Sequence, residues 1–509
     1  MEPPTAPARH VEIEIKLEAD DTWQLPDLHA VPGVIAVSAP VVHQLDAVYF
    51  DTARLDLLGS RVTLRRRTGG SDAGWHLKLP GTAGSRTEVA LGLDPGGPLP
   101  EEATIPAGLA TLVAGITRGR DLRPVARLRT ERTVLRVSDG SGAELLEVAD
   151  DRVSAGSALP DDRRPDCWRE VEIELVDGSA EDLRAAGQLL VAAGATPSRS
   201  ASKLGRALAA AGRTPVPGPS GDVGRRSSAA QVVLASLDRQ RRALLDAELG
   251  LRLEAPDAAR AALAAARRLR STVQVFGSLI SDDCADTVRR RLRPMIKSLT
   301  DAVDLATCAE HITVGLLEEP VGLAGPAGVA AEELLADLRR PTQVRVARWL
   351  AGTGPASLFK ALDRLVEHPA AETPGADRVL PPLVDARWDI AVRRASALRR
   401  QPDDLQAAAR MVKACRTARH AAELAGIASG VDTVVFAAAV EQVEEMVQAR
   451  LACLRTADLL LTLASAPMTT GASAFVWGRL HSFELATADG AADDIADAWG
   501  RAEDAAVRR

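Results

Sequence analysis

The chain has 509 residues, 46% of them hydrophobic and 26% charged, with a formal net charge of −7. This length requires more than one hydrophobic core, and the acidic balance argues against nucleic acid as a partner. No leader peptide and no apolar run near the roughly 18 residues of a membrane span occur, so we expect a cytoplasmic protein without membrane contact. The five scattered cysteines contain no CxxC pair. They suggest reduced thiols and exclude a cysteine zinc site at the sequence level.

The first part of the chain is predicted to be β-rich. From Val11 to about Leu175, short segments alternate polar and apolar residues between Gly, Pro and Asp clusters. A helix is expected at 180–193 and a short segment at 202–210. We therefore predict an α+β domain. The expected strands are 11–18, 61–67, 75–79, 86–91, 132–137 and 169–175.

The polar faces of these strands carry an unusual set of charges. Because side chains alternate between the two faces of a strand, Glu12, Glu14 and Lys16 share one face. The same geometry aligns the three glutamates of 169–175 and the basic residues of 61–67. A solvated outer face is the simpler interpretation, but glutamates in register repel one another without cations. If the sheet closes with this face inward, acids and bases line one tunnel. Oxygen ligands suit Mg²⁺ or Mn²⁺, and Arg and Lys suit phosphate.

The composition changes after a Pro/Gly-rich stretch. We predict one domain over 1–212, a linker over 213–226 and a helical domain over 227–509. A second interruption at 368–382 divides the helical part into about 227–367 and 383–509, each with an Arg-rich helix. This pattern predicts an all-α domain of two related helical bundles.

The first domain resembles the CYTH family, also called triphosphate tunnel metalloenzymes. EIEIK at 12–16 matches the family's ExExK signature. Further segments follow in family order over roughly 10–210, namely YFDT (49–52), LRRR (64–67), the Lys78 strand, the Arg86 and Glu88 pair, the basic strand around Arg127 and Arg129, EVADD (147–151), REVEIEL (169–175) and SKLGRAL (202–208). The resemblance implies an eight-stranded antiparallel β tunnel that hydrolyses or cyclises triphosphates with a divalent metal.

The resemblance also implies residue roles. Lys16, Arg65 and Glu172 would be catalytic. A one-residue slip in register would exchange Asp151 with Asp150, or Arg127 and Arg129 with Arg132, because it swaps the faces. The metal ligands would be Glu12, Glu14, Glu147, Asp151, Glu170, Glu172 and Glu174. The phosphate-binding residues would be Lys16, Arg65, Arg67, Lys78, Arg86, Arg127, Arg129 and Lys203.

The helical part resembles the CHAD family, which the resemblance links to polyphosphate binding. Two interpretations stay open, a polyphosphate groove and a scaffold or dimerisation module with solvated basic faces. The family's upstream histidines are replaced here, and His311, His368 and His481 are expected to be structural or surface residues. The groove residues would be Arg267, Arg268, Arg270, Lys413, Arg416 and Arg419.

The leading functional prediction is metal-dependent hydrolysis of a small triphosphate, most of all inorganic triphosphate. Water would attack the terminal phosphorus in line, while Arg and Lys neutralise the developing charge. The alternatives are a nucleoside or thiamine triphosphatase, a class IV-like adenylate cyclase, and a polyphosphate-binding protein with little turnover. A homodimer is a further expectation.

Overall fold

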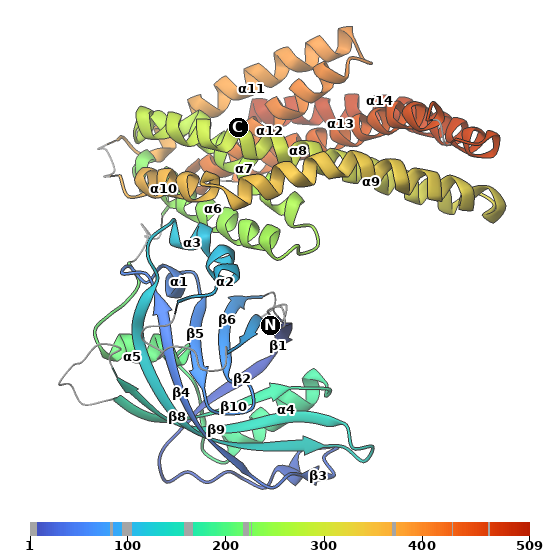
Figure 1. The fold of residues 1–509 in the computed structure, drawn as a ribbon. Coiled ribbons are helices and arrows are strands. Elements are labelled where there is room, and N and C mark those ends of the chain that lie inside the picture. The colour runs from blue at the N-terminus through green and yellow to red at the C-terminus, as the bar shows by residue number, and fades with distance from the viewer. Residues whose placement is uncertain are drawn as a thin grey trace. The chain divides into compact units, whose positions relative to one another are not determined.

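The computed structural model describes residues 8–81, 85–93, 104–156, 166–216, 223–224, 226–368, 373–429, 431–466 and 469–508. The chain forms two compact units, Met1–Pro217 and Gly218–Arg509 (Figure 1). This boundary falls within the predicted linker, of which 217–222 and 225 lie outside the described residues. Each unit is treated separately below.

The first unit is built on one antiparallel sheet with short helices around it. The strands are β1 (Ala8–Glu12), β2 (Glu14–Ala19), β3 (Ala36–Val37), β4 (Val41–Asp51), β5 (Thr63–Thr68), β6 (Gly74–Pro80), β7 (Arg86–Gly92), β8 (Arg123–Ser138), β9 (Glu144–Gly156), β10 (Asp166–Leu175) and β11 (Thr196–Pro197). The helices are η1 (Leu28–Ala30), α1 (Asp56–Gly59), α2 (Ala107–Leu112), α3 (Ala114–Thr117), α4 (Ala180–Ala192) and α5 (Lys203–Ala210).

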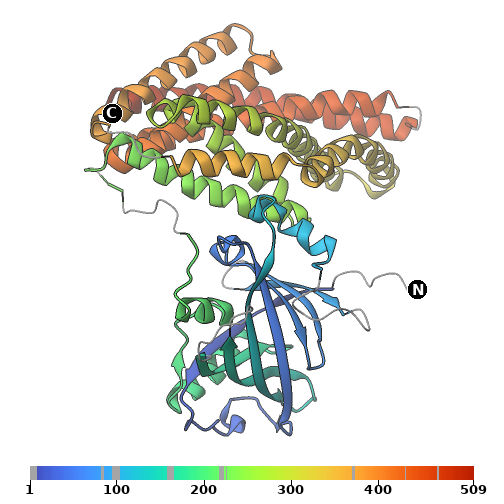
Figure 2. The same cartoon turned by 60° about the vertical axis from the view of Figure 1, so that its left-hand side comes forward.

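The sheet closes on itself through its first strand. Its order is β1-β7-β6-β5-β4-β8-β9-β10-β2-β11, and only Ile13 separates β1 from β2. This bent segment therefore pairs with β7 through its first half and with β10 through its second half. When β1 and β2 are counted as one strand, this strand and the seven strands from β4 through β10 form a tunnel of eight long strands (Figure 2). The predicted antiparallel β tunnel is confirmed.

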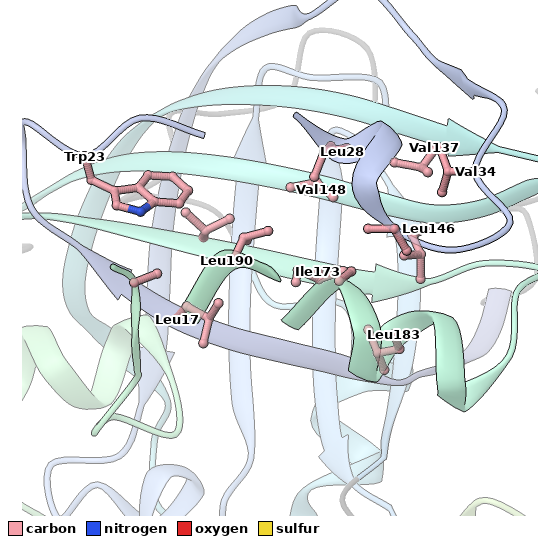
Figure 3. Close-up of a cluster of buried hydrophobic side chains, with 14 residues drawn as sticks. Leu17, Trp23, Leu28, Val34, Val137, Leu146, Val148, Ile173, Leu183 and Leu190 are labelled. Atoms are coloured by element: carbon pink, nitrogen blue, oxygen red, sulfur yellow. The ribbon is translucent and has the colours of Figure 1, made fainter. Parts of the chain in front are cut away.

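One wall of the tunnel is backed by an apolar layer. Leu17 of β2, Val148 of β9 and Ile173 of β10 pack with Leu183 and Leu190 of α4 (Figure 3). Burying each such side chain stabilises the fold by about 1.5–3 kcal/mol. Since side chains alternate along a strand, this layer directs the intervening charged residues of the same strands into the tunnel.

Helix α4 begins at a residue that the sequence marks well. Ser179 is the N-cap and accepts a hydrogen bond from the Asp182 amide, and the Asp182 carboxylate accepts one from the Ser179 amide. This reciprocal capping satisfies two amide groups that the first turn would otherwise leave without partners. It fixes where the apolar face of α4 starts against the sheet.

A second apolar cluster fills one end of the tunnel unit. It contains Tyr49 and Trp168 from the strands and Leu204 and Leu208 from α5. Ser202 caps α5 by accepting a hydrogen bond from the Gly205 amide. This packing places the first residue of α5, Lys203, beside the charged interior.

Among its described residues, the second unit is helical apart from an isolated bridge between Ser228 and Gly375. The predicted all-α domain is confirmed. No helix in the described part of the chain is long and apolar enough to cross a membrane. The helices are α6 (Ala229–Arg252), α7 (Ala258–Phe276), η3 (Gly277–Leu279), α8 (Asp282–Leu317), α9 (Val321–Ala351), α10 (Gly354–Val366), α11 (Ala376–Arg400), α12 (Leu405–Ser429), α13 (Val431–Ala464) and α14 (Gly471–Arg508).

The helices pack in corresponding pairs. Helices α6 and α11, α7 and α12, α8 and α13, and α9 and α14 are in contact. The starts of α6 and α11 are also joined, since the Ala229 amide donates to Pro374 O and the Ala376 amide to Ser227 O, both at 3.1 Å. The predicted division at 368–382 covers the connection between α10 and α11 and also the first seven residues of α11, 376–382, which are helical, with 369–372 outside the described residues. This arrangement supports the duplication, which stays a prediction.

Candidate functional site

The tunnel holds a cavity of about 250 Å³ whose walls are almost entirely ionisable. We call it the tunnel cavity. The residues predicted from the sequence that line it are Glu12, Glu14, Lys16, Arg65, Arg67, Lys78, Arg86, Glu147, Glu172, Glu174 and Lys203. Lining residues outside that predicted set are His10, Tyr49, Thr63, Asp72, His76, Glu88, Ala90, Arg132 and Ser202.

Three glutamates form a row across one wall of the cavity. Glu174 on β10 is the register partner of both Glu14 on β2 and Glu147 on β9. Burial is the main reason that the pKa of Glu174 is raised; the charges of Glu147 and Glu14 raise it further, against the opposing charge of Lys78. Carboxylates arranged in this way repel one another unless a cation lies among them. The row therefore suits a hard divalent ion with oxygen ligands.

A second acidic cluster lies where β1 meets β7. His10 Nε2 is 3.3 Å from a Glu12 oxygen and 3.6 Å from a Glu88 oxygen. Burial, followed by a hydrogen bond with Glu88, raises the pKa of Glu12 to about 8. The two carboxyl groups thus share a proton, and Lys78 Nζ contacts Glu12 at 2.7 Å. One ligand atom from each of His10, Glu12 and Glu88 falls within 4.8 Å of the others, which makes the cluster a second potential metal site.

Glu172 is the acceptor on which the bases of the cavity converge. Its carboxylate lies 2.8 Å from Lys16 Nζ, 2.8 Å from Lys203 Nζ and 2.6 Å from Arg132 Nη2. Burial alone would raise the pKa of Glu172, but the charges of Lys16, Lys203 and Arg132 hold it well below its ordinary value. The carboxylate is therefore ionised and keeps three cations in place along the cavity wall.

Two arginines on β5 lack enough acidic partners. The Nε atoms of Arg65 and Arg67 are buried and have no hydrogen-bond partner in the described part of the chain. Burial, followed by the charge of Arg65, lowers the pKa of Arg67 to about 10. Arg65 Nη1 donates a long hydrogen bond of 3.4 Å to the Tyr49 hydroxyl. Guanidinium groups held this way are suited to an anion such as phosphate, which they bind through paired N–H donors.

Comparison with known proteins agrees with this geometry. Residues 10–207 match the CYTH domain family and residues 235–461 match the CHAD domain family. The Mycobacterium tuberculosis protein described as Uncharacterized protein Rv2226 is 31% identical over 533 residues, which cover 99% of this chain and 98% of that protein. This chain belongs to the CYTH–CHAD proteins.

Solved structures show more distant likeness to the CYTH–CHAD chain. PptA from Streptomyces chartreusis is 21% identical with a TM-score of 0.45, covering 54% of this chain and all (100%) of its own. The CHAD domain from the plant Ricinus communis is 16% identical with a TM-score of 0.41, covering 55% of this chain and 93% of its own.

Two predicted metal ligands of the CYTH tunnel lie behind the cavity wall. Asp151 is fully buried and accepts hydrogen bonds from Arg132 at 2.8 and 2.6 Å. Glu170 contacts Lys203 Nζ at 2.5 Å and accepts a hydrogen bond from the Trp168 indole at 2.7 Å. Neither residue lines the tunnel cavity, so both hold basic side chains in position rather than facing a ligand directly.

Two predicted phosphate ligands lie away from the cavity, and we correct their assignment. Arg127 Nη2 contacts Asp46 at 2.7 Å, and Arg129 pairs with the same carboxylate while its side chain is 70% exposed. Arg132 is the basic residue of β8 that lines the cavity. The sequence alone did not separate these positions, because β8 carries arginines on both faces and alternation puts odd and even positions on opposite sides.

The CHAD unit gathers cations from α7 and α12. Arg416 and Arg419 contact Glu444 at 2.5 and 3.0 Å, while Arg268 and Arg419 contact Glu423. The others form no salt bridge in the described part of the chain, although the charges of Asp304 and Glu444 act on Arg267. Burial, followed by the charge of Arg416, lowers the pKa of Arg267 to about 10 and also lowers that of Arg270. Burial, followed by the charge of Arg270, lowers the pKa of Lys413.

A buried histidine lies beside this cation cluster and was not predicted to contribute. His420 on α12 has a buried Nδ1 without a hydrogen-bond partner among the described residues. Burial, followed by the charges of Arg268 and Arg419, lowers its pKa to about 2, so the imidazole is neutral. Packing among cations, which the sequence does not show, decides its protonation state.

Proposed function

We propose that the CYTH tunnel hydrolyses a small triphosphate, inorganic triphosphate first, with Mg²⁺ or Mn²⁺. One observation carries this proposal. The row of Glu14, Glu174 and Glu147 shares a single cavity with Arg65 and Arg67, whose buried Nε atoms lack partners in the described part of the chain. Such a cavity is complementary to a cation together with an anion of several charges, which is what a metal-bound polyphosphate is.

The cavity's carboxylates fit the metal that this function needs. Glu14, Glu147 and Glu174 would hold it, with Glu12 and Glu172 beside them, because all present oxygen ligands to the same space. When bound, the ion supplies a lowered pKa for an attacking water and charge neutralisation on phosphate oxygens.

The basic residues would bind and orient the triphosphate chain. Lys16, Lys78 and Lys203 are held by ion pairs to Glu172 and Glu12, so each is already placed when substrate arrives. Arg65, Arg67, Arg86 and Arg132 add donors along the same cavity. Fixed donors of this kind stabilise charge that develops on phosphate oxygens as the bond to the leaving group breaks.

The size of the cavity favours a small substrate. Its volume of about 250 Å³ is below the roughly 300–1,000 Å³ of pockets that enclose drug-sized ligands. Tyr49 is the only Phe, Tyr or Trp that lines it in the described part of the chain. A nucleoside or a thiazole would find little apolar wall there, so nucleoside and thiamine triphosphates and cyclisation of ATP rank below inorganic triphosphate.

Phosphate release by the purified full-length protein tests the proposal. Inorganic triphosphate, ATP, thiamine triphosphate and long-chain polyphosphate are compared with Mg²⁺, Mn²⁺ or EDTA. We expect release from inorganic triphosphate that depends on the metal and exceeds release from the others. Absence of phosphate release from every substrate would contradict hydrolysis, and a cyclic product from ATP would point to the cyclase alternative.

A second candidate function belongs to the CHAD unit, which we infer binds polyphosphate. It is favoured by the mutual repulsion of Arg267, Arg270, Arg416 and Lys413, which a polyanion would relieve. In this case the helical unit would target or concentrate substrate. A scaffold or homodimer role and a cytoplasmic location remain predictions.

A further inference from the structure

A third group of ionisable side chains lies inside the helical unit, apart from its cation cluster. His311 on α8, Cys453 on α13 and Glu484 on α14 meet there. One possible ligand atom from each lies within 4.8 Å of the other two. His311 Nδ1 is 3.1 Å from both carboxylate oxygens of Glu484. Helix α8 and the consecutive helices α13 and α14 therefore bring an imidazole, a thiol and a carboxylate together.

The surroundings hold this group in place. Cys453 and Glu484 are buried, and the helices beside them contribute Ile312 and Leu480 to an apolar cluster. Burying a carboxylate in such surroundings costs free energy unless it has a hydrogen-bonding partner, and His311 is such a partner for Glu484. The His311 side chain is 31% exposed, so the group is open to solvent on one side only.

We propose that His311, Cys453 and Glu484 form a site for a borderline-soft transition metal of the Zn²⁺ class. Zinc binds thiolate, imidazole and carboxylate, at roughly 2.0–2.3 Å, and tolerates a fourth position filled by water. Ligand atoms around one such ion are separated by distances like the 3.1 Å between His311 and Glu484. On binding, the thiol proton of Cys453 and the proton that His311 Nδ1 donates to Glu484 both leave to solvent, and the exposed side provides the fourth position.

The site differs in chemistry from the tunnel cavity. The tunnel's acidic donors are carboxylates, which favour Mg²⁺ or Mn²⁺, whereas a thiolate and an imidazole favour softer ions. No cysteine lines the tunnel cavity in the described part of the chain. The two sites would thus select different cations from the same solution.

Sequence spacing gave no sign of this site. Zinc sites are usually recognised by pairs of ligands a few residues apart. The closest such pair here is Cys308 with His311, and Cys308 is not among the three grouped ligands. His311 and Glu484 are 173 positions apart. The scattered cysteines therefore seemed to exclude a cysteine zinc site and His311 seemed structural, whereas helix packing gathers the three ligands.

Cobalt titration of the full-length protein tests the proposal. The protein is stripped with a chelator, returned to excess Mg²⁺ and titrated with Co²⁺, which reports a thiolate ligand through a near-ultraviolet charge-transfer band. We expect one such band per chain that saturates at one Co²⁺ and is displaced by Zn²⁺. Cys453→Ser should abolish the band, while Cys415→Ser, at a buried thiol outside the group, should keep it.

Zinc affinity gives the second readout. Loss of a supporting residue around a metal site costs roughly 10–100-fold in affinity, so loss of the Cys453 thiolate should cost more than about 100-fold. Glu484→Gln and His311→Gln serve as independent variants if Cys453→Ser alters folding, which circular dichroism checks. Triphosphate hydrolysis should be unchanged in all of them. No thiolate band in the wild type, or a band that persists in Cys453→Ser, would overturn the proposal.

Discussion

Lys16 on β2 and Glu172 on β10 are register partners, and their side chains form a 2.8 Å ion pair inside the tunnel. Burial alone would lower the pKa of Lys16, but the carboxylates of Glu172 and Glu14 raise it. Both groups are therefore charged. Pairs of this kind help a tunnel full of charge to remain folded without a ligand, because each member offsets the cost of burying the other. A bound metal would contact the carboxylates of such pairs, and a bound triphosphate would contact their basic side chains.

Replacing a cavity arginine should impair catalysis far more than replacing an outer one. Arg65→Gln removes a buried donor, and loss of one donor to a developing oxyanion costs about 100- to 1,000-fold in turnover. We expect a drop in kcat/KM of that size for inorganic triphosphate. Arg129→Gln, on the outer face of β8, should change kcat/KM less than about twofold. Equal losses in the two variants would contradict the corrected assignment of β8.

Removing one carboxylate from the glutamate row should weaken metal binding. Glu174→Gln should raise the Mg²⁺ concentration for half-maximal activity by about 10- to 100-fold, and high Mg²⁺ should restore part of the rate. Glu131→Gln, at an exposed position of β8, is the matched control. Steady-state rates over a Mg²⁺ titration provide the measurement. An unchanged metal requirement in Glu174→Gln would exclude this residue as a ligand.

The shared proton between Glu12 and Glu88 predicts a pH dependence of stability. Burial raises the pKa of Glu12 from 4.5 to about 8 in the folded protein. Between these values the folded state holds a proton that the unfolded chain has released, so the free energy of unfolding falls as pH rises.

The measurement is the thermal midpoint in EDTA from pH 5 to pH 8. The difference in thermal midpoint between wild type and Glu12→Gln should change with pH across this window, because the wild type loses more stability as pH rises. Glu131→Gln, treated identically, should track the wild type. Parallel profiles for wild type and Glu12→Gln would mean that Glu12 holds no extra proton.

The CHAD cation cluster predicts retention on immobilised polyphosphate. The double variant Arg267→Gln/Arg270→Gln removes two cations that form no salt bridge in the described structure and should elute at clearly lower salt. Arg289→Gln/Arg290→Gln removes the same charge from an exposed part of α8. Because nonspecific attraction depends on net charge and is screened by salt, it would shift both variants alike. Such parallel elution would argue against a groove.

The sequence predicted the tunnel because its signals are local. Glu12, Glu14 and Lys16 alternate with apolar residues, and the structure shows Ile15 and Leu17 in the apolar layer with α4 while the charges face the cavity. Val11 and Ile13, nearer the start of the segment, are exposed. Period-2 alternation is enough to assign faces when only one face is charged.

Other lining residues depend on contacts that alternation does not encode. Asp72 follows β5 in a turn and reaches the cavity by pairing with Arg67. His10 precedes the ExExK segment and enters through the pairing of β1 with β7. Arg132 differs from Arg127 and Arg129 only by the face of β8 that it occupies. Register between distant strands decides these positions, and one sequence does not fix it.

The central claim is that carboxylates in the tunnel hold a metal for triphosphate hydrolysis. The measurement that tests it most directly is phosphate release from inorganic triphosphate by wild type and by Glu12→Gln/Glu14→Gln, each with Mg²⁺, Mn²⁺ or EDTA. We predict metal-dependent release by the wild type and its loss in a folded double variant. Metal-independent release, or unchanged release by the double variant, would contradict the claim.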